Sequence, residues 1–403
     1  MDTQNTPIHV KLWHREFWLM AVANLLLTMS VYMLIPIVPQ FMFSSQFTPL
    51  ATGFAMGVFG IGVFALGGFC SYLVQRYRRN NVCMWSIVGV MASLAAMYYI
   101  MKMPTSDLQA ALIIIDRFVM GAFFGLSQMV LSSTLIIDTC ESFQRTQANH
   151  AAAWFSRFAV SLGPLYAMTF CMQIGRDAAI IGAVVSAGIS LVLIRLINFP
   201  FRTPEETLKK YSLDRFFLVQ GAPLFVNLML ITAIFGLTLS LHHTGMFYCM
   251  LMAGFVLALI AERHVFLNAD LKSEVVTGLI VIFAAFLLLF THYPHVGSYI
   301  APAMLGFGIG IIGSRFLLFF IKLANHCQRG TSQSTFFLAW ELGLSLGLGL
   351  GLSQVGLNEA VSAEYMATHR NSEVLMLGLV LSAACLLIYI YFVHPWYMKH
   401  KNR

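Results

Sequence analysis

Long apolar segments separated by short polar ones run through the whole chain. A transmembrane helix needs about 20 mostly apolar residues, and twelve segments satisfy this rule. The pattern therefore predicts an all-α membrane protein with twelve transmembrane helices. The predicted spans are 17–43, 50–74, 82–101, 108–137, 149–171, 178–198, 219–241, 245–261, 273–291, 298–324, 332–356 and 374–394.

The composition agrees with this pattern. Of the 403 residues, 59% are apolar and 10% are charged, whereas soluble domains contain roughly 25% charged residues. The seven cysteines are scattered, without a CxxC pair or a His/Cys cluster, so we expect no metal site, disulfide framework or cofactor. The first apolar run is too long, and begins too late, for a cleavable signal peptide.

Lysine and arginine are unevenly distributed between the two sides of the predicted spans. With the N-terminus inside, 18 of the 24 fall on the cytoplasmic side, three in outer loops and three within spans. An excess of Lys and Arg is typical of cytoplasmic loops. We therefore expect an inner- or plasma-membrane protein with both termini in the cytoplasm. The same bias explains the net charge of +7 without a nucleic-acid partner.

The longest polar break, from Phe199 to Gln220, divides the spans six and six. This predicts an N-terminal six-helix bundle at 1–198, a central cytoplasmic linker at 199–220 and a C-terminal six-helix bundle at 221–403.

A short internal repeat supports the division. Shifting the chain by 184 residues places Arg145 on Arg329, and Ser161-Leu162-Gly163 on Ser345-Leu346-Gly347. The small residues recur at every fourth position in both segments, a spacing that lets membrane helices approach closely. The same shift places Arg157 on Glu341, so opposite charges are predicted at equivalent depths.

Three short motifs carry a family resemblance. Arg117 is followed four residues later by Gly121, Ser161-Leu162-Gly163-Pro164 lies in the fifth span, and the segment from Ser71 to Asn80 lies between spans two and three. They resemble the span-four, antiporter and G-x-L-A-D-R-x-G-R-R motifs of the major facilitator superfamily. In the last motif Arg76 and Arg79 fit but Gln75 replaces the aspartate. A weaker second copy keeps Glu262-Arg263.

The resemblance implies a secondary transporter that moves a small-molecule substrate by alternating access. It implies gating or conformational roles for Arg76, Arg79, Gly163, Pro164, Glu262 and Arg263. We expect a monomer in the lipid bilayer, with protons as the coupling ion. Drug/proton exchangers of this superfamily often carry an acid in the first span, whose polar residues here include Asn24 and Tyr32 but no acid. That subclass is therefore disfavoured.

Three charged residues of spans four and five are candidates for the transport path. Asp116 and Arg117 are adjacent in span four, and Arg157 in span five is long enough to reach Asp116. A charge at the bilayer centre costs at least ~2.5 kcal/mol, and such residues usually serve a solute or proton path. We expect substrate attraction by an arginine, which favours an anionic or zwitterionic solute, and a proton site at Asp116. A structural ion pair is the alternative.

Glu341, which follows Trp340 in span eleven, is the leading candidate for the proton carrier. A carboxylic acid away from water can exchange a proton near neutral pH. Arg315 in span ten is its candidate partner, and a fixed Glu341–Arg315 bridge is the alternative. Asn24, Tyr32, Gln128 and Trp340 are expected to line the path, with helix packing or lipid contact as the alternative.

An enzyme is not expected. Gly343-Leu344-Ser345-Leu346-Gly347 matches G-x-S-x-G, but a nucleophile elbow needs a strand, a turn and a helix, and this serine lies within a predicted span. No phosphate-binding loop appears, so the energy must come from a gradient. The favoured function is proton-coupled export of a small organic solute by antiport. Uptake by symport or facilitated transport is the alternative, and a membrane sensor or membrane enzyme is less favoured.

Overall fold

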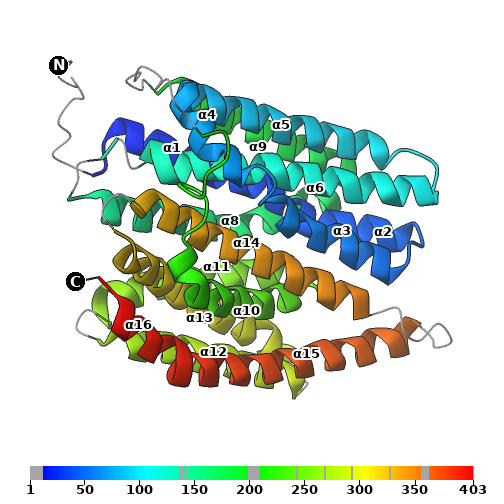
Figure 1. Cartoon of the computed structure of the whole chain (residues 1–403). Helices are drawn as coiled ribbons and strands as arrows, with labels where there is room; N and C mark the ends of the chain where they lie inside the picture. The colour runs from blue at the N-terminus through cyan, green and yellow to red at the C-terminus, as the bar shows by residue number, and fades with distance from the viewer. Residues whose placement is uncertain are drawn as a thin grey trace.

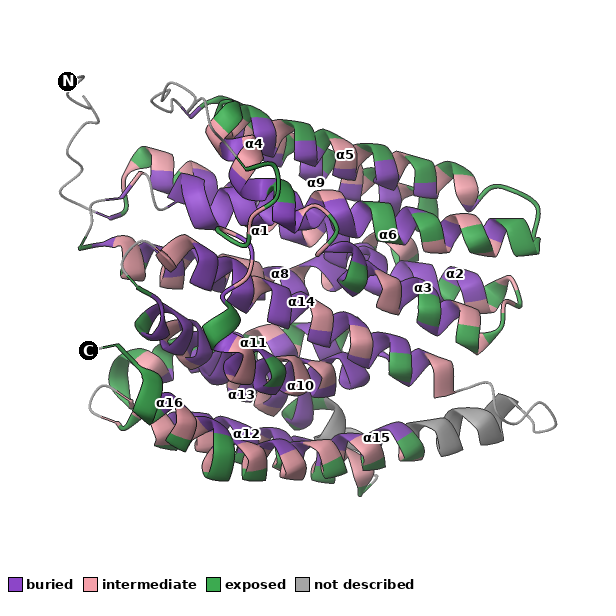
Figure 2. Cartoon of the chain, viewed as in Figure 1, coloured by how far each residue is buried: buried purple, intermediate pink, exposed green. Residues whose placement is uncertain are grey.

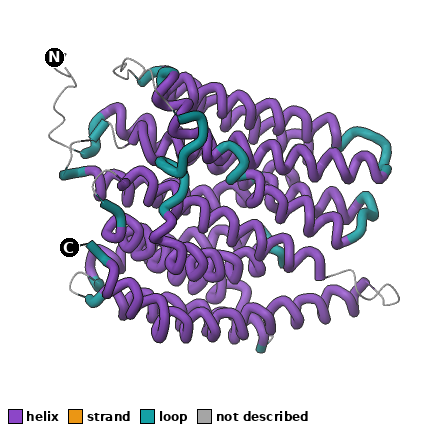
Figure 3. Tube along the Cα trace, viewed as in Figure 1, coloured by secondary structure: helices purple, strands orange, loops and turns teal. Residues whose placement is uncertain are grey.

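The computed structural model describes residues 12–136, 139–140, 143–197, 209–241, 244–266, 269–291, 294–325, 328–354 and 363–402. This part of the chain is helical, without strands (Figure 3). Eleven of its helical segments are long and apolar enough to cross a membrane. The remaining predicted span, 149–171, lies within the 29-residue helix α8, which is more polar because it carries charged and amide side chains.

The helices of the first half begin and end within a few residues of the predicted spans. They are α1 (Arg15–Tyr32), α2 (Leu34–Ser44), α3 (Pro49–Gly62), η1 (Gly67–Phe69), α4 (Cys70–Arg76), α5 (Arg79–Ile100), α6 (Asp107–Val130), the π-helical turn η2 (Leu131–Leu135), α8 (Arg145–Gln173) and α9 (Arg176–Arg195).

The second half has the same regularity. Its helices are η3 (Val219–Gly221), α10 (Ala222–Leu239), α11 (Gly245–His264), α12 (Leu271–Phe290), α13 (Pro294–Leu323), α14 (Arg329–Ser353), α15 (Ala363–Ile388), the π-helical turn η6 (Tyr389–Val393) and α16 (His394–His400). The two arginines aligned by the internal repeat, Arg145 and Arg329, are the first residues of α8 and α14.

A proline explains why the first span consists of two helices. α1 and α2 are separated only by Met33. Pro36 has no N–H group to donate to the carbonyl of Tyr32, and its ring crowds that carbonyl. The helix is therefore interrupted one turn before the proline, beside the tyrosine that lines the central cavity described below.

The helices pack as two sets that meet along the middle of the molecule (Figure 1). In the first set, α1 packs on α8 and α9, and α6 packs on α3 and α5. In the second, α10 packs on α14, and α13 packs on α11 and α12. The predicted two-bundle fold is therefore confirmed. Residues 198–208, which include the first part of the predicted linker, lie outside the described residues, so the predicted domain limits stay a prediction.

Burial follows this arrangement. Buried residues gather along the facing sides of the helices, and exposed residues lie on the outward faces (Figure 2). Many outward side chains are large and apolar; Trp85 and Phe392 are 73% and 72% exposed. Apolar outward faces suit a hydrocarbon surrounding, where the backbone polar groups must be paired inside the helices.

A strap formed by residues 211–218 connects the two halves at one end of the molecule. This end, where α1 begins and α16 ends, is named the strap end (Figure 1). Asp214 accepts hydrogen bonds from Ser71 Oγ at 3.3 Å and from Thr331 Oγ1 at 3.2 Å. Arg215 Nη1 donates to Thr134 Oγ1 at 3.1 Å. The strap thus joins α4 and η2 of the first half to α14 of the second.

Towards the opposite end, the halves touch through glycines of α3 and α14. A Cβ atom added at Gly53 would lie 2.4 Å from the carbonyl oxygen of Gly349. Such an approach is open only to residues without a side chain. Ser161 of α8 also donates a 2.5 Å hydrogen bond to the carbonyl oxygen of Tyr248 in α11. Contacts therefore cross between the halves on both sides of the molecular centre.

Candidate functional site

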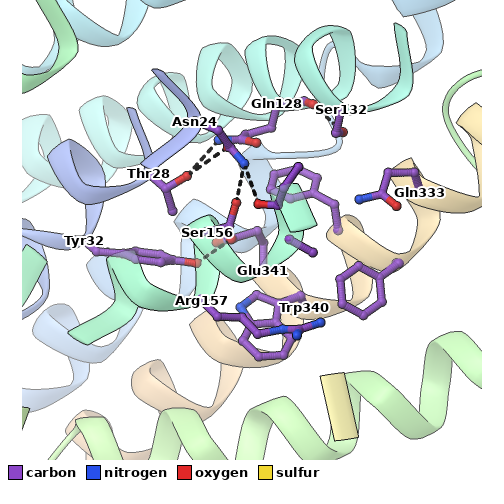
Figure 4. A pocket seen from close by; sticks show the side chains of 14 residues that line it. Asn24, Thr28, Tyr32, Gln128, Ser132, Ser156, Arg157, Gln333, Trp340 and Glu341 are labelled. Carbon is purple, nitrogen blue, oxygen red and sulfur yellow. Dashed lines mark hydrogen bonds between the residues drawn. The ribbon is translucent and has the colours of Figure 1, made fainter. Parts of the chain in front are cut away.

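A cavity lined by polar and aromatic side chains lies between the two helix sets. Its walls come from α1, α6, η2 and α8 of the first half and from α14 of the second. The polar side chains around it come from all of these elements, and the aromatic ones come from α14 except for Tyr32 of α1 (Figure 4). The lining residues are Asn24, Thr28, Tyr32, Gln128, Ser132, Ala152, Ala153, Ser156, Arg157, Gln333, Phe336, Phe337, Trp340 and Glu341.

The wall from the first half is a network of paired polar groups (Figure 4). Asn24 Nδ2 donates to the Ala152 carbonyl at 3.1 Å and to Ser156 Oγ at 2.8 Å. Gln128 Nε2 donates to Thr28 Oγ1 at 2.9 Å. Asn24 and Gln128 thus lie in the cavity wall, where both amide hydrogens of Asn24 and one of Gln128 are bonded.

Glu341 and Tyr32 face each other across the two halves. Tyr32 Oη donates a 2.5 Å hydrogen bond to Glu341 Oε1, and the second carboxyl oxygen, Oε2, is buried without a hydrogen-bond partner among the described residues. Only 2% of Glu341 is exposed. A buried carboxyl group with one free oxygen can take up a proton or a donor group from a solute.

A second, smaller cavity is also lined by this pair. Tyr32 and Glu341 line both cavities, while Arg117 lines only the smaller one. The Arg117 guanidinium lies over the Phe59 ring at 4.6 Å, and its Nε atom has no hydrogen-bond partner in the described part of the chain. The Tyr32–Glu341 pair therefore forms the partition between two spaces, one of which contains an arginine.

Asp116, the predicted proton site of span four, is buried in α6 next to Arg117. It lines neither cavity, and its Oδ2 atom is buried without a hydrogen-bond partner among the residues described. Arg157 does not reach it, because the Arg157 side chain extends into the second half instead. Adjacent residues of a helix point in different directions, so only Arg117 of the Asp116-Arg117 pair faces a cavity.

Arg157 lies between two tryptophans. Its guanidinium carbon is 4.8 Å from the Trp154 ring and 6.0 Å from the Trp340 ring. Nη1 donates a 2.6 Å hydrogen bond to Ser314 Oγ of α13. The Nε and Nη2 atoms are buried and have no hydrogen-bond partner among the described residues. Arg157 and Glu341, aligned by the internal repeat, thus line one cavity from opposite halves.

The predicted partnership of Arg315 with Glu341 is wrong. Arg315 Nε forms an ion pair with Glu274 Oε2 of α12, and it lines neither of the cavities that Glu341 borders. The prediction compared depth along the spans but had no information on the direction in which each helix turns its side chains. Glu274 lies within the predicted span 273–291, and its charge there was the available signal.

The residues with predicted gating roles lie at different places. Glu262 Oε2 is 3.4 Å from His150 Nε2, so its partner comes from α8 of the other half rather than from the adjacent Arg263, which is exposed. Gly163 packs against α1, where a Cβ atom would lie 2.9 Å from the Met29 carbonyl oxygen.

Three further predicted residues lie near the helix ends or within α8. Pro164 is buried inside α8. Arg76 is exposed at the end of α4, and Arg79 begins α5. No described cavity includes any of the three.

Several lining residues had not been predicted. Ser156, Gln333, Phe336 and Phe337 line the larger cavity. Each lies on the same helix as a predicted residue, Arg157 or Glu341, and within about two turns of it. Helical spacing from those charges was the signal that points to them. Ser314, which holds Arg157, carried no such signal.

Two helix bundles around a shared polar cavity define an α-helical membrane transporter. The family model described as Major Facilitator Superfamily matches residues 20–348. The chain belongs to this superfamily and is a secondary transporter rather than an enzyme.

Solved transporter structures share this fold. An auto inhibited POT family peptide transporter has a TM-score of 0.65 and 13% identity, with 97% of this chain and 98% of that chain covered. The human organic anion transporter MFSD10 (TETRAN) has a TM-score of 0.60 and 15% identity, with 91% and 99% covered. The nucleoside transporter NupG has a TM-score of 0.67 and 13% identity, with 93% and 99% covered. A comparison with curated protein sequences gives no match.

Proposed function

We propose that this protein carries a small organic solute in the larger cavity and couples its movement to protons through Glu341. One observation carries this proposal. Glu341 is a buried acid that borders two cavities, is tied to the opposite half by Tyr32 and keeps one oxygen free. An intramembrane ionisable residue in such a place is by default a functional residue.

Alternating access would occur by rocking of the two bundles, 1–198 and 221–403, about this cavity, with 199–220 as the linker. Towards one end the α3–α14 glycine contact must separate to admit solute. At the other end, the strap and the His150–Glu262 pair must separate. Because contacts are present on both sides, the described conformation agrees with a state in which neither side is open.

The sequence supports a cytoplasmic location for both termini, since most Lys and Arg residues then lie inside. We therefore propose that the strap end faces the cytoplasm. The protein is proposed to be a monomer in the inner or plasma membrane. A single cysteine introduced at an exposed position of that end, such as Arg76, would react with a water-soluble maleimide only after the membrane is permeabilised. Reaction in intact cells would show that the strap end faces outward instead.

Two directions of coupling are candidates. The Gly163-Pro164 motif favours exchange of solute for protons and therefore export. The second direction is uptake by symport. The unpaired donors of Arg157 favour it when the solute is an anion. An anion bound in the cavity favours the protonated, neutral form of Glu341, so that solute and proton are carried together.

Proteoliposomes that contain a pH-sensitive dye test the proposal. A dipeptide, a nucleoside and an organic anion are suitable first solutes because they represent the chemistry of the three structural neighbours. Solute movement under an imposed pH gradient is the expected result. Opposite fluxes of solute and proton identify antiport, and parallel fluxes identify symport. Solute movement that no ion gradient affects would reject proton coupling while leaving facilitated transport.

A further inference from the structure

We infer that the larger cavity binds a small organic anion, with a carboxylate on the free edge of Arg157 and an apolar body against the aromatic wall of α14. This inference rests on the proposed function only in taking the cavity as the solute site. It names the solute class and the residue that selects it.

The hydrogen bonds of Arg157 leave one complete edge of its guanidinium free. Nη1 is used by Ser314. The two atoms without partners, Nε and Nη2, belong to the same edge of the planar group, and their N–H bonds are parallel. Parallel N–H donors at this spacing match the two oxygens of a carboxylate, which they bind in a bidentate manner.

The surroundings hold this edge in place and keep it dry. Arg157 is 2% exposed, and Trp154 and Trp340 lie within cation–π distance of the guanidinium. Gly313 of α13 lies beside it, and a Cβ atom there would come within 2.8 Å of Nε. The absence of a side chain at Gly313 thus lets α13 lie against the donor edge, and a side chain there would crowd Nε.

The nearby acids leave a place for an anion. Glu262 interacts electrostatically with Arg157, but its ion-pair partner is His150. Glu341 lines the same cavity, yet it forms no ion pair with Arg157 among the described residues. An unpaired buried donor is unfavourable, and an incoming carboxylate satisfies two of them at once.

The rest of the cavity selects the body of the solute. On α14, Phe336, Phe337 and Trp340 line the cavity between Gln333 and Glu341, and rings of this kind bury apolar or aromatic groups. On the facing wall, both amide hydrogens of Asn24 and one of Gln128 are already bonded within the protein. A solute with one carboxylate and an aryl or alkyl body therefore fits better than a highly hydroxylated one.

Three probes with one skeleton test the inference: phenylacetate, phenylacetamide and phenylethylamine. Each is added to the purified full-length protein and the melting temperature is measured, since a ligand of the folded state raises it by mass action. Phenylacetate is expected to raise it most, with an apparent Kd roughly ten- to hundredfold lower than that of the amide. Equal shifts, a larger shift with either other probe, or no shift with any probe overturns the inference.

Variants identify the residue. Arg157→Gln is expected to abolish the preference for phenylacetate, and Arg157→Lys to keep only part of it, because lysine lacks the bidentate edge. Arg176→Gln removes an exposed arginine of α9 and should keep the preference. If Arg157→Gln fails to fold, Gly313→Ala gives the same test by crowding Nε without changing charge. A preference that survives in the folded Arg157→Gln or Gly313→Ala protein contradicts the role of the donor edge.

The flux assay separates this inference from the proposed function. If the dye-filled proteoliposomes move a nucleoside or a dipeptide with protons but no probe carboxylate binds preferentially, the anion inference fails and the transporter proposal stands. If phenylacetate binds through Arg157 but no solute moves in any gradient, the proposed function fails and the anion site stands.

Discussion

Tyr32 of α1 and Glu341 of α14 are joined by a 2.5 Å hydrogen bond, although 309 residues separate them in the sequence. The bond crosses between the two bundles, and the same two side chains border both central cavities. A solute that occupies the larger cavity lies against this pair. A change in the protonation of Glu341 alters the same hydrogen bond. The pair is therefore placed to link binding, proton exchange and the closeness of the bundles.

Replacing Glu341 with glutamine keeps the size of the side chain and a hydrogen-bonding oxygen but removes the exchangeable proton. We expect Glu341→Gln to stop solute accumulation driven by a pH gradient and to retain counterflow, in which solute exchanges for solute. The measurement compares both fluxes in proteoliposomes with a solute identified by the panel above. Glu373→Gln, which changes an exposed acid of α15, is the matched control. Undiminished pH-driven accumulation in Glu341→Gln would remove Glu341 as the proton carrier.

The apolar spans were predictable because membrane insertion depends on the hydropathy of one segment at a time. All twelve predicted segments correspond to described helices, and the three short motifs around Arg117, Gly163 and Arg76 indicated the superfamily whose model matches the chain. Depth along a span was also predictable, since it needs only a rise per residue. Arg157 and Glu341, which the internal repeat predicts at equivalent depths, line the same cavity.

Side-chain partners were not predictable, because they depend on how each helix is rotated about its axis. Arg315 was assigned to Glu341 by depth, but its helix turns it towards Glu274. Arg157 was expected to approach Asp116, yet it bonds Ser314 of the other bundle. Apolar faces indicate the orientation of a helix in water, whereas in a membrane the outward and inward faces are both apolar. The pattern therefore carries little information on rotation.

The glycines of α3 give a matched pair of substitutions. In Gly53→Ala the new methyl group would lie 2.4 Å from the Gly349 carbonyl oxygen, so α3 and α14 must move apart. Overpacking of this kind costs roughly 1–3 kcal/mol, and a lower melting temperature with slower solute transport is expected. In Gly57→Ala the nearest atom would lie at 3.7 Å, an ordinary contact, so little change is expected. Equal melting temperatures for the two variants would show that the tight contact is unimportant.

The Arg315–Glu274 pair is expected to stabilise the second bundle without taking part in transport. Removing one partner leaves a buried charge, so Arg315→Leu and Glu274→Leu should each destabilise the protein by about 3–5 kcal/mol. The double variant should recover most of this loss, because no unpaired charge remains. Thermal unfolding of the three variants measures the effect, and pH-driven flux in the double variant checks transport. Loss of coupling in a stable double variant would return Arg315 to the proton path.

The strap gives a prediction about closure at its end of the molecule. Asp214 is the acceptor that joins Ser71 of α4 to Thr331 of α14. Asp214→Ala removes both bonds and is expected to lower stability by about 1–3 kcal/mol, while Asp214→Asn, which can still accept one bond at its remaining oxygen, should have a smaller effect. At least one of these bonds must break whenever this end opens, so their loss also favours the open form. A cysteine introduced at Ser132, a residue of η2 that lines the cavity, should therefore react faster with a water-soluble maleimide in the Asp214→Ala background than in the otherwise unchanged protein. An unchanged labelling rate, together with an unchanged melting temperature, would show that these bonds do not hold the two halves together.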